Sequence, residues 1–255
     1  MNGHTQAIWE IAYTAARARR LDLQAELVRQ YGYVVQGGPF ASMVLPERVC
    51  RGDGDILPKL LGVYEAELHT PLAALMADEP DLVIDVGAAE GFYMAGLARL
   101  LPTVRVHAFD HDDLAQDICR EAARLNGVES RVSVGGKCSA ELLRLLLGRA
   151  ARPAVLCDVE GQETELIDPA QVPALASTFL IVECHDFLNP AITRTLAQRL
   201  EATHDLQLVQ EGGRDPNAIP MLRSLNSLDR WIAMCEFRPQ TMHWLVAKPR
   251  RRGGG

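Results

Sequence analysis

Short apolar runs alternate with helical patterns along most of the chain from residue 79 onward. Such runs predict buried β-strands, and seven of them lie at 82–86, 104–109, 131–134, 154–157, 179–183, 206–209 and 244–247. Helical patterns follow most of these runs, as strand–helix–strand units require. The alternation predicts an α/β fold with a mostly parallel sheet and helices on both faces. The last run follows a loop-rich insertion at 211–240 and predicts an antiparallel strand that returns into the sheet.

The first 78 residues follow a different pattern and predict an N-terminal helical preface. Residues 4–30 predict one helix that ends before Gly32. A second helical region at 57–77 is expected to be split or kinked at Pro71. The first helix carries an apolar stripe made of Ile8, Ile11, Ala15 and Ala18. We expect this stripe to cover the core, with pairing to another subunit as the alternative.

The composition is that of a globular chain, since 48% of its 255 residues are hydrophobic. We divide it into the preface at 1–78, a core at 79–249 and a tail at 250–255. The net charge of −7 argues against a nucleic-acid partner. No apolar run approaches the roughly 20 residues that a membrane span needs. The polar opening is not a signal peptide, and six cysteines without a C-x-x-C pair favour free thiols, so we expect a cytoplasmic protein.

A glycine-containing turn follows the first strand of the sheet, in the pattern Asp85-x-Gly87-x-x-x-Gly91. It differs from the dinucleotide pattern G-x-G-x-x-G and lacks the lysine of a phosphate-binding loop. An acidic residue two positions before the first glycine suits a ligand that carries a cationic amino group and no phosphates. The second strand ends in Asp110, where a carboxylate can bind a ribose diol. Together these features predict S-adenosylmethionine (SAM) as the ligand.

The residues after the fourth and fifth strands are the main candidates for catalysis, because ligands in such sheets bind beyond the carboxyl ends of the strands. Asp158 and Glu160 share a face after the fourth strand, and Glu183 and His185 share one at the end of the fifth. A histidine suits the removal of a proton from a hydroxyl or an amine that attacks a methyl group. We expect His185 to be the base and Asp158 to orient it, with Glu160 beside them. A divalent cation held by all four residues is the alternative that we rank below metal-free catalysis.

Other charged residues near these positions have simpler interpretations. We expect Glu163 and Glu165 only to favour the N-terminus of a short helix. Four arginines of the insertion could recognise an anionic group, but exposed side chains are the simpler account: Arg214, Arg223, Arg230 and Arg238.

Five motifs between about residues 79 and 190 resemble the FkbM-type class I SAM-dependent methyltransferases. They are Ile84–Gly91, Ala108–Asp110, Asn126–Val128, Cys157–Glu163 and Ile181–His185. The D-V-E-G run followed by V-E-x-H is the more specific part, since the glycine motif is common to class I enzymes. The stretches 38–40 and 57–65 of the preface are similar to a bacterial subgroup of that family. One departure is Gln162, where the family often has alanine.

The resemblance implies a Rossmann-like, seven-stranded sheet and methyl transfer, mostly to oxygen atoms of sugars or secondary metabolites. The residues that we expect around SAM are Asp85, Gly87, Ala88, Glu90, Gly91, Tyr93, Asp110 and Cys138. Asp158 and His185 are expected to face the substrate. Cys138, after the third strand, is expected in the wall of the adenine site.

Three alternatives stay open at this point. Methyl transfer to nitrogen would use Glu160 or Glu183 to hold an amine. A non-catalytic SAM- or nucleotide-binding protein, such as a partner subunit, would keep the cofactor site alone. A dehydrogenase is the weakest alternative, because G-x-G-x-x-G is absent. The expected partner is a small-molecule substrate, and the chain could also form a homodimer.

Overall fold

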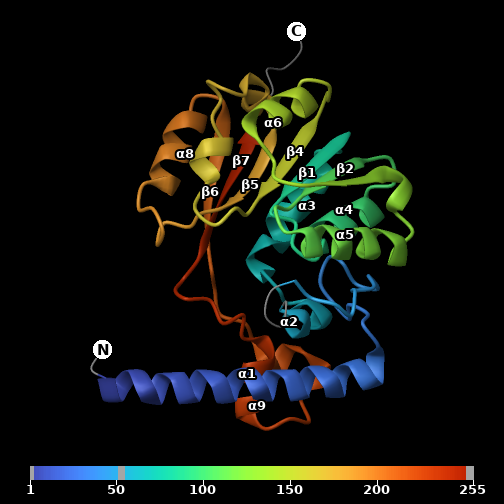
Figure 1. Ribbon diagram of the computed structural model, residues 1–255, viewed down its shortest axis with the longest axis vertical. Helices are drawn as coiled ribbons and strands as arrows, with labels where there is room; N and C mark the ends of the chain where they lie inside the picture. The colour runs from blue at the N-terminus through green and yellow to red at the C-terminus, as the bar shows by residue number, and fades with distance from the viewer. Residues whose placement is uncertain (1–2, 51–54, 251–255) are drawn as a thin grey trace.

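The described part of the chain, residues 3–50 and 55–250 of a computed structural model, is built around one seven-stranded sheet (Figure 1). Its strands are β1 (Leu82–Val86), β2 (Arg105–Phe109), β3 (Val132–Gly135), β4 (Pro153–Cys157), β5 (Phe179–Glu183), β6 (His204–Gln210) and β7 (His243–Pro249). All seven strands that the apolar runs predict are therefore present. The predicted tail lies outside the described residues, apart from Arg250.

The strands lie in the order β3-β2-β1-β4-β5-β7-β6. Strands β1 to β5 are parallel to their neighbours, and β7 is antiparallel to both β5 and β6. This confirms the prediction of a final strand that returns antiparallel into the sheet. Because β1 pairs with β2 on one side and β4 on the other, the strand order reverses at β1, and its carboxyl end is where a ligand is expected.

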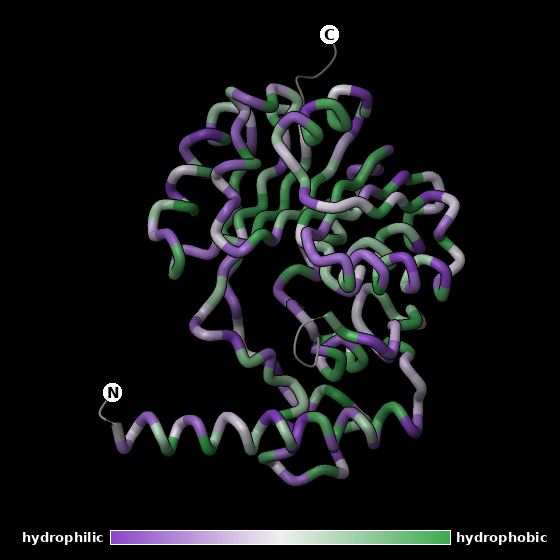
Figure 2. Tube along the Cα trace, in the orientation of Figure 1, coloured by the Kyte–Doolittle hydropathy of each residue, from purple (hydrophilic) through white to green (hydrophobic). Residues whose placement is uncertain are grey.

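Helices cover both faces of the sheet, as predicted. Those that follow the strands are α4 (Phe92–Leu100), α5 (Asp113–Leu125), α6 (Ala140–Leu147), α7 (Glu163–Leu166) and α8 (Ile192–Leu200). Helices α4 and α5 pack on the core of one face, where Val83 of β1 points, and α6 and α8 pack on the other, where Ile84 points. The central strands are buried along their whole length and form the hydrophobic interior in Figure 2.

The preface contains α1 (Gly3–Tyr31), α2 (Ile56–Leu61) and α3 (His69–Ala77). The long first helix confirms the prediction for 4–30. The break in the second region differs from the prediction, since it follows Gly62 rather than Pro71. Gly62 ends α2 in the left-handed conformation with φ +74°, which glycine adopts without strain. Pro71 lies in the first turn of α3, where a missing N–H costs no helical hydrogen bond.

The insertion is more ordered than its composition predicts. It contains α9 (Ser227–Met234), which the sequence analysis does not predict. Helix α9 packs against α1 at the end of the molecule remote from the sheet (Figure 1), in a third hydrophobic cluster that includes Leu23, Leu57 and Ile232. The preface and the insertion, far apart in sequence, therefore form one layer.

The prediction that the stripe of α1 covers the core is wrong. Ile8 and Ile11 are 54% and 71% exposed, and Ala15 and Ala18 are exposed as well. A different face of α1, which includes Leu23, packs on α9. None of the helices in the described part of the chain has both the length and the apolar character of a membrane span.

Candidate active site

A large cavity lies at the carboxyl ends of β1, β2 and β4. Its volume is about 1080 Å³, which is at the upper end for sites of small molecules and cofactors. Among the residues that line it are Gly87, Asp110, Cys138, Asp158 and Glu160. A second cavity of about 60 Å³ shares Gly87, Ala89 and Asp158 with the first, and Asp85 and Glu183 also line it. The two cavities therefore meet at the turn after β1.

The turn after β1 brings two strand ends into close contact. Gly87 has φ +85°, and a Cβ atom at this position would lie 1.7 Å from the carbonyl oxygen of Asp158. Only glycine fits there, because a side chain would displace the backbone that follows β4. Gly91 also has positive φ, +77°, and a Cβ atom there would lie 2.5 Å from Cε of Met94. Gly91 lines neither of the two cavities, so its contacts are those of helix packing.

Asp110 fastens this turn to the end of β2. Its Oδ2 accepts the backbone N–H of Ala89 at 3.0 Å, and its Oδ1 accepts that of Asp112 at 2.9 Å. The carboxylate is buried and lines the large cavity. Since each carboxylate oxygen has two lone pairs, both can still accept hydrogen bonds from a ligand.

Asp85 is a buried carboxyl group with a free oxygen. Its side chain lines the small cavity, only 4% of the residue is exposed, and Oδ2 has no hydrogen-bond partner among the described residues. Burial, and secondarily the charges of Asp158 and Asp110, raise its pKa to about 7. The backbone N–H of Met94 lowers the pKa only in part, and a buried carboxylate oxygen without a partner is costly, so this position favours a cationic ligand group.

The other residues expected around SAM differ in whether they also make hydrogen bonds or ion pairs to the preface. Ala88, Glu90 and Tyr93 line the small cavity, and Cys138 is buried in the wall of the large one. Glu90 pairs with Nζ of Lys59 at 3.3 Å and accepts the backbone N–H of Cys50 at 3.2 Å. The hydroxyl of Tyr93 donates to Glu65. Glu90 and Tyr93 therefore also hold the preface against the core.

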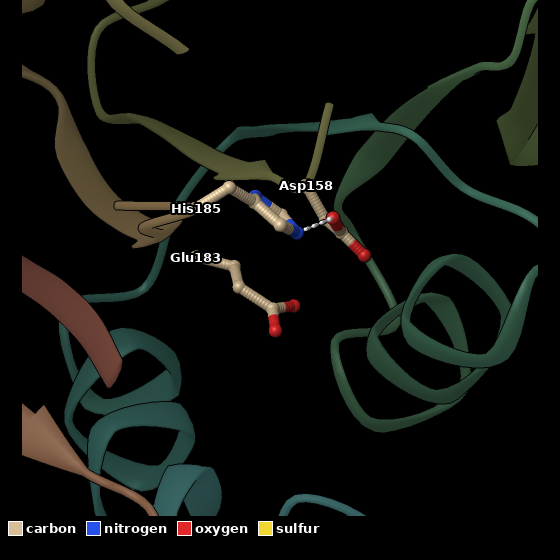
Figure 3. Close-up of side chains that lie close together, drawn as sticks. All are labelled: Asp158, Glu183 and His185. Atoms are coloured by element: carbon tan, nitrogen blue, oxygen red, sulfur yellow. Dashed lines mark ion pairs between the residues drawn. The ribbon is translucent and has the colours of Figure 1, made fainter. Parts of the chain in front are cut away.

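His185 lies two residues after the end of β5, and both of its ring nitrogens face carboxylates. Nδ1 is 2.5 Å from Oε1 of Glu163, while Nε2 is 3.5 Å from Oδ1 of Asp158 and 3.5 Å from Oε2 of Glu160 (Figure 3 shows the contact with Asp158). The structure thus brings the three predicted catalytic residues together. It adds Glu163, which is completely buried.

Glu163 does not have the minor role that the sequence analysis gives it. Gln162 is the residue before α7, while Glu163 points inward, accepts the backbone N–H of Gly161 at 3.0 Å and contacts His185. Glu165, two residues later, is exposed. The sequence contains no signal that separates the two glutamates, because only the packing of α7 beside the end of β5 decides which one is buried.

The surroundings of His185 and Asp158 favour the protonated form of each side chain, because they raise both pKa values. Burial acts to lower the pKa of His185, but the hydrogen bond to Glu163 and the charges of Asp158 and Glu160 outweigh it and raise the pKa. Asp158 is 47% exposed, toward the cavity. Partial burial is the main cause that raises its pKa to about 7, against the charge of His185 and with smaller contributions from the charges of Glu65 and Glu160.

Glu183 is tied to the insertion by a buried network of ion pairs. Arg238 contacts Glu183 at 2.6 Å, Glu65 at 2.6 Å and Glu236 at 3.1 Å. Arg214 in turn contacts Glu236 at 2.5 Å and Glu67 of the preface at 3.0 Å.

The expectation of exposed arginines is therefore wrong for Arg214 and Arg238. Their side chains are largely buried because carboxylates of the preface and of β5 surround them. Their contacts join the preface, the insertion and the sheet.

Three residues at the strand ends could hold a metal ion. Asp158, Glu183 and His185 (Figure 3) each offer a ligand atom, and these atoms lie within 4.8 Å of one another. Glu183, however, already has a cation in Arg238. The charge on this carboxylate is thus balanced without a metal.

No protein-family model and no curated protein matches the chain. Similar solved structures include an O-methyltransferase from Bacillus cereus in complex with SAH, at 15% identity over 92% of this chain and 91% of that chain, with a TM-score of 0.43. TomG, an O-methyltransferase of tomaymycin synthesis from Streptomyces achromogenes in complex with SAM, is 14% identical over 90% and 89%, with a TM-score of 0.44. A precorrin-6y C5,15-methyltransferase from Geobacter metallireducens is 12% identical over 81% and 93%, with a TM-score of 0.46.

Values this low carry no argument about activity or substrate. We assign the fold from the order and direction of the strands. Strands β1 to β5 are parallel, and the antiparallel β7 lies between β5 and β6. This topology is the Rossmann-like fold of class I methyltransferases.

Proposed function

We propose that the chain is a SAM-dependent methyltransferase that acts on a hydroxyl group of a small molecule, such as a sugar or a secondary metabolite. The observation that carries this proposal is the setting of His185 beside two carboxylates that line the cavity. Its Nδ1 is held by the buried Glu163, and its Nε2 lies 3.5 Å from both Asp158 and Glu160, two carboxylates that line the cavity. This is the arrangement of a general base whose tautomer is fixed by a carboxylate.

The cavity has the features that SAM requires. Its volume suffices for a nucleoside with an amino-acid arm, and it lies where the strand order reverses. Oδ2 of Asp85 would accept the ammonium group, Asp110 would accept the ribose hydroxyls, and Cys138 would lie against the adenine ring. When bound, SAM supplies an electrophilic methyl group.

The protein would act mainly by proton transfer and positioning. The acceptor hydroxyl loses its proton to Nε2 of His185, and the imidazolium that forms is stabilised by Glu163 at Nδ1 and by Asp158 beside Nε2. Asp158 and Glu160 would also orient the hydroxyl toward the methyl group. Since only the neutral imidazole accepts a proton, the rate is expected to rise as the pH passes upward through the raised pKa of His185.

One observation favours an amine as a second candidate acceptor. The residues that line the two cavities near the β4 end include Asp85, Asp158, Glu160 and Glu183, and of these Glu183 is paired with an arginine. With Asp85 assigned to SAM, Asp158 and Glu160 could hold the ammonium group of an acceptor, which would then lose its proton to His185 before attack.

The test is a methyl-transfer screen with isotopically labelled SAM against hydroxylated and amine acceptors, read by mass spectrometry. With the acceptor found, His185→Asn should lower turnover by about 10²–10⁴-fold and leave SAM affinity nearly unchanged. His107→Asn, a change of a half-buried histidine in β2, is the control. Unchanged turnover in His185→Asn would exclude the base, and loss of SAM binding would make His185 a structural residue.

A further inference from the structure

Helix α1 carries a second surface that nothing in the described structure covers. We call it the outer seam, and it consists of His4, Ile8, Ile11, Ala15, Ala18 and Asp22, all of them exposed. Successive members are four and three residues apart in strict alternation. This is the spacing of a coiled-coil seam, which faces one other helix.

The body of the protein leaves the outer seam accessible. The face of α1 that packs inward is fixed by Leu23 in the cluster with α9 and by the ion pair of Arg19 with Asp229 at 2.9 Å. Tyr13 is the residue nearest the N-terminus among these contacts, where it meets Phe237 edge-on. Before it, α1 extends past the body into solvent (Figure 1). Ile8 and Ile11 are exposed on this part of α1, and their apolar side chains stay in contact with water unless another molecule covers them.

We propose that a second copy of the chain packs on the outer seam, with the two α1 helices antiparallel. The seam is its own complement when one copy is reversed. Ile8 of one copy then lies opposite Ala18 of the other, and Ile11 lies opposite Ala15. At both ends of the contact, His4 lies opposite Asp22.

This pairing fits in both size and charge. A large side chain meets a small one at every apolar position, which lets the helices approach closely without voids. At the ends, His4 can donate a hydrogen bond to Asp22, which also lies 3.7 Å from Arg19 of its own helix. A parallel pair would instead place isoleucine on isoleucine, alanine on alanine and Asp22 on Asp22, which leaves gaps and a like-charge contact. The sequence of the seam therefore specifies the antiparallel arrangement.

The proposal is tested by sedimentation equilibrium of the full chain over a range of protein concentrations. We expect a reversible dimer for the wild type. Ala15→Ile, which sets isoleucine against isoleucine, should weaken it by about tenfold or more. The double variant Ile11→Ala with Ala15→Ile exchanges the large and small residues and should restore dimerisation. Leu145→Asp, at an exposed leucine of α6 outside the seam, should leave it unchanged.

Three results would overturn the proposal. A monomeric wild type at every concentration would mean that the seam serves another occupant. A dimer that survives Ile11→Asp would place the interface elsewhere. A double variant no better than Ala15→Ile alone would exclude the antiparallel register. Circular dichroism is used to establish that each variant keeps its helix content. Whether the wild type dimerises at all is decided without any variant.

Discussion

Glu163 and His185 depend on each other at the centre of the site. A completely buried carboxylate is stable only with a strong hydrogen-bond donor, and Nδ1–H of His185 at 2.5 Å provides one. In return, Glu163 keeps the proton on Nδ1 and leaves Nε2 to face Asp158 and Glu160. The ring orientation that the proposed base requires is thus set by Glu163, which lines neither cavity.

Replacing Glu163 tests this dependence without any substrate. Glu163→Gln should lower the pKa of His185, because the main interaction that raises it against the effect of burial is lost. It should also shift the neutral ring away from the Nδ1–H tautomer. Both are read from ¹⁵N-histidine NMR. Glu165→Gln, an exposed glutamate of the same helix, is the matched control, and an equal pKa of His185 in both variants would contradict this account.

Asp85 should make ligand affinity depend on pH. Its pKa of about 7 means that the carboxyl is protonated below this pH and charged above it. A ligand with an ammonium group should therefore bind more tightly as the pH rises through 7, and its binding should release a proton. Calorimetry with SAM at several pH values measures both effects. In Asp85→Asn the pH dependence should be much weaker, and an unchanged pH dependence would rule Asp85 out as the ammonium partner.

At the scale of elements, the turn after β1 determines how closely β1 and β4 approach. Gly87→Ala should cost more than about 3 kcal/mol of unfolding free energy, because the strain of positive φ adds to a contact of 1.7 Å with the Asp158 backbone. Gly127→Ala is the control, since its φ is +64° but its Cβ would meet no atom within 4 Å. It should cost only about 1–2 kcal/mol. Urea unfolding compares the two, and similar losses would show that the strand ends can separate.

Most elements of the core could be predicted from sequence, because the central strands are buried on both faces and appear as continuous apolar runs. The same reasoning brought Asp158, Glu160 and His185 together, since parallel strands end at one edge. Prediction from the sequence failed where contacts between distant segments or the backbone conformation determine the local structure. Helix α9 exists because α1 and α2 pack on it, and the break at Gly62 depends on backbone conformation rather than on the nearby proline. Glu163 reaches His185 only through the packing of α7.

At the scale of the whole molecule, buried ion pairs join the preface, the insertion and the sheet. Arg238 is the central cation of this network and faces Glu65, Glu183 and Glu236. Arg238→Met should cost about 3–5 kcal/mol, because it leaves buried carboxylates without their cation. Arg223→Met, at an exposed arginine of the insertion, should change stability by less than about 0.5 kcal/mol. Equal urea midpoints for the two variants would mean that the three parts are held by apolar contacts alone.

The most direct test of the central claim is a calorimetric titration of the wild-type chain with SAM and with S-adenosylhomocysteine. We predict saturable one-to-one binding of both ligands in the cavity beyond β1, and weaker binding in Asp110→Ala, with circular dichroism to establish that the variant is folded. The absence of binding of either ligand to a folded wild-type chain would contradict the account. The cavity would then belong to a different ligand, and His185 would have no methyl group to direct a nucleophile toward.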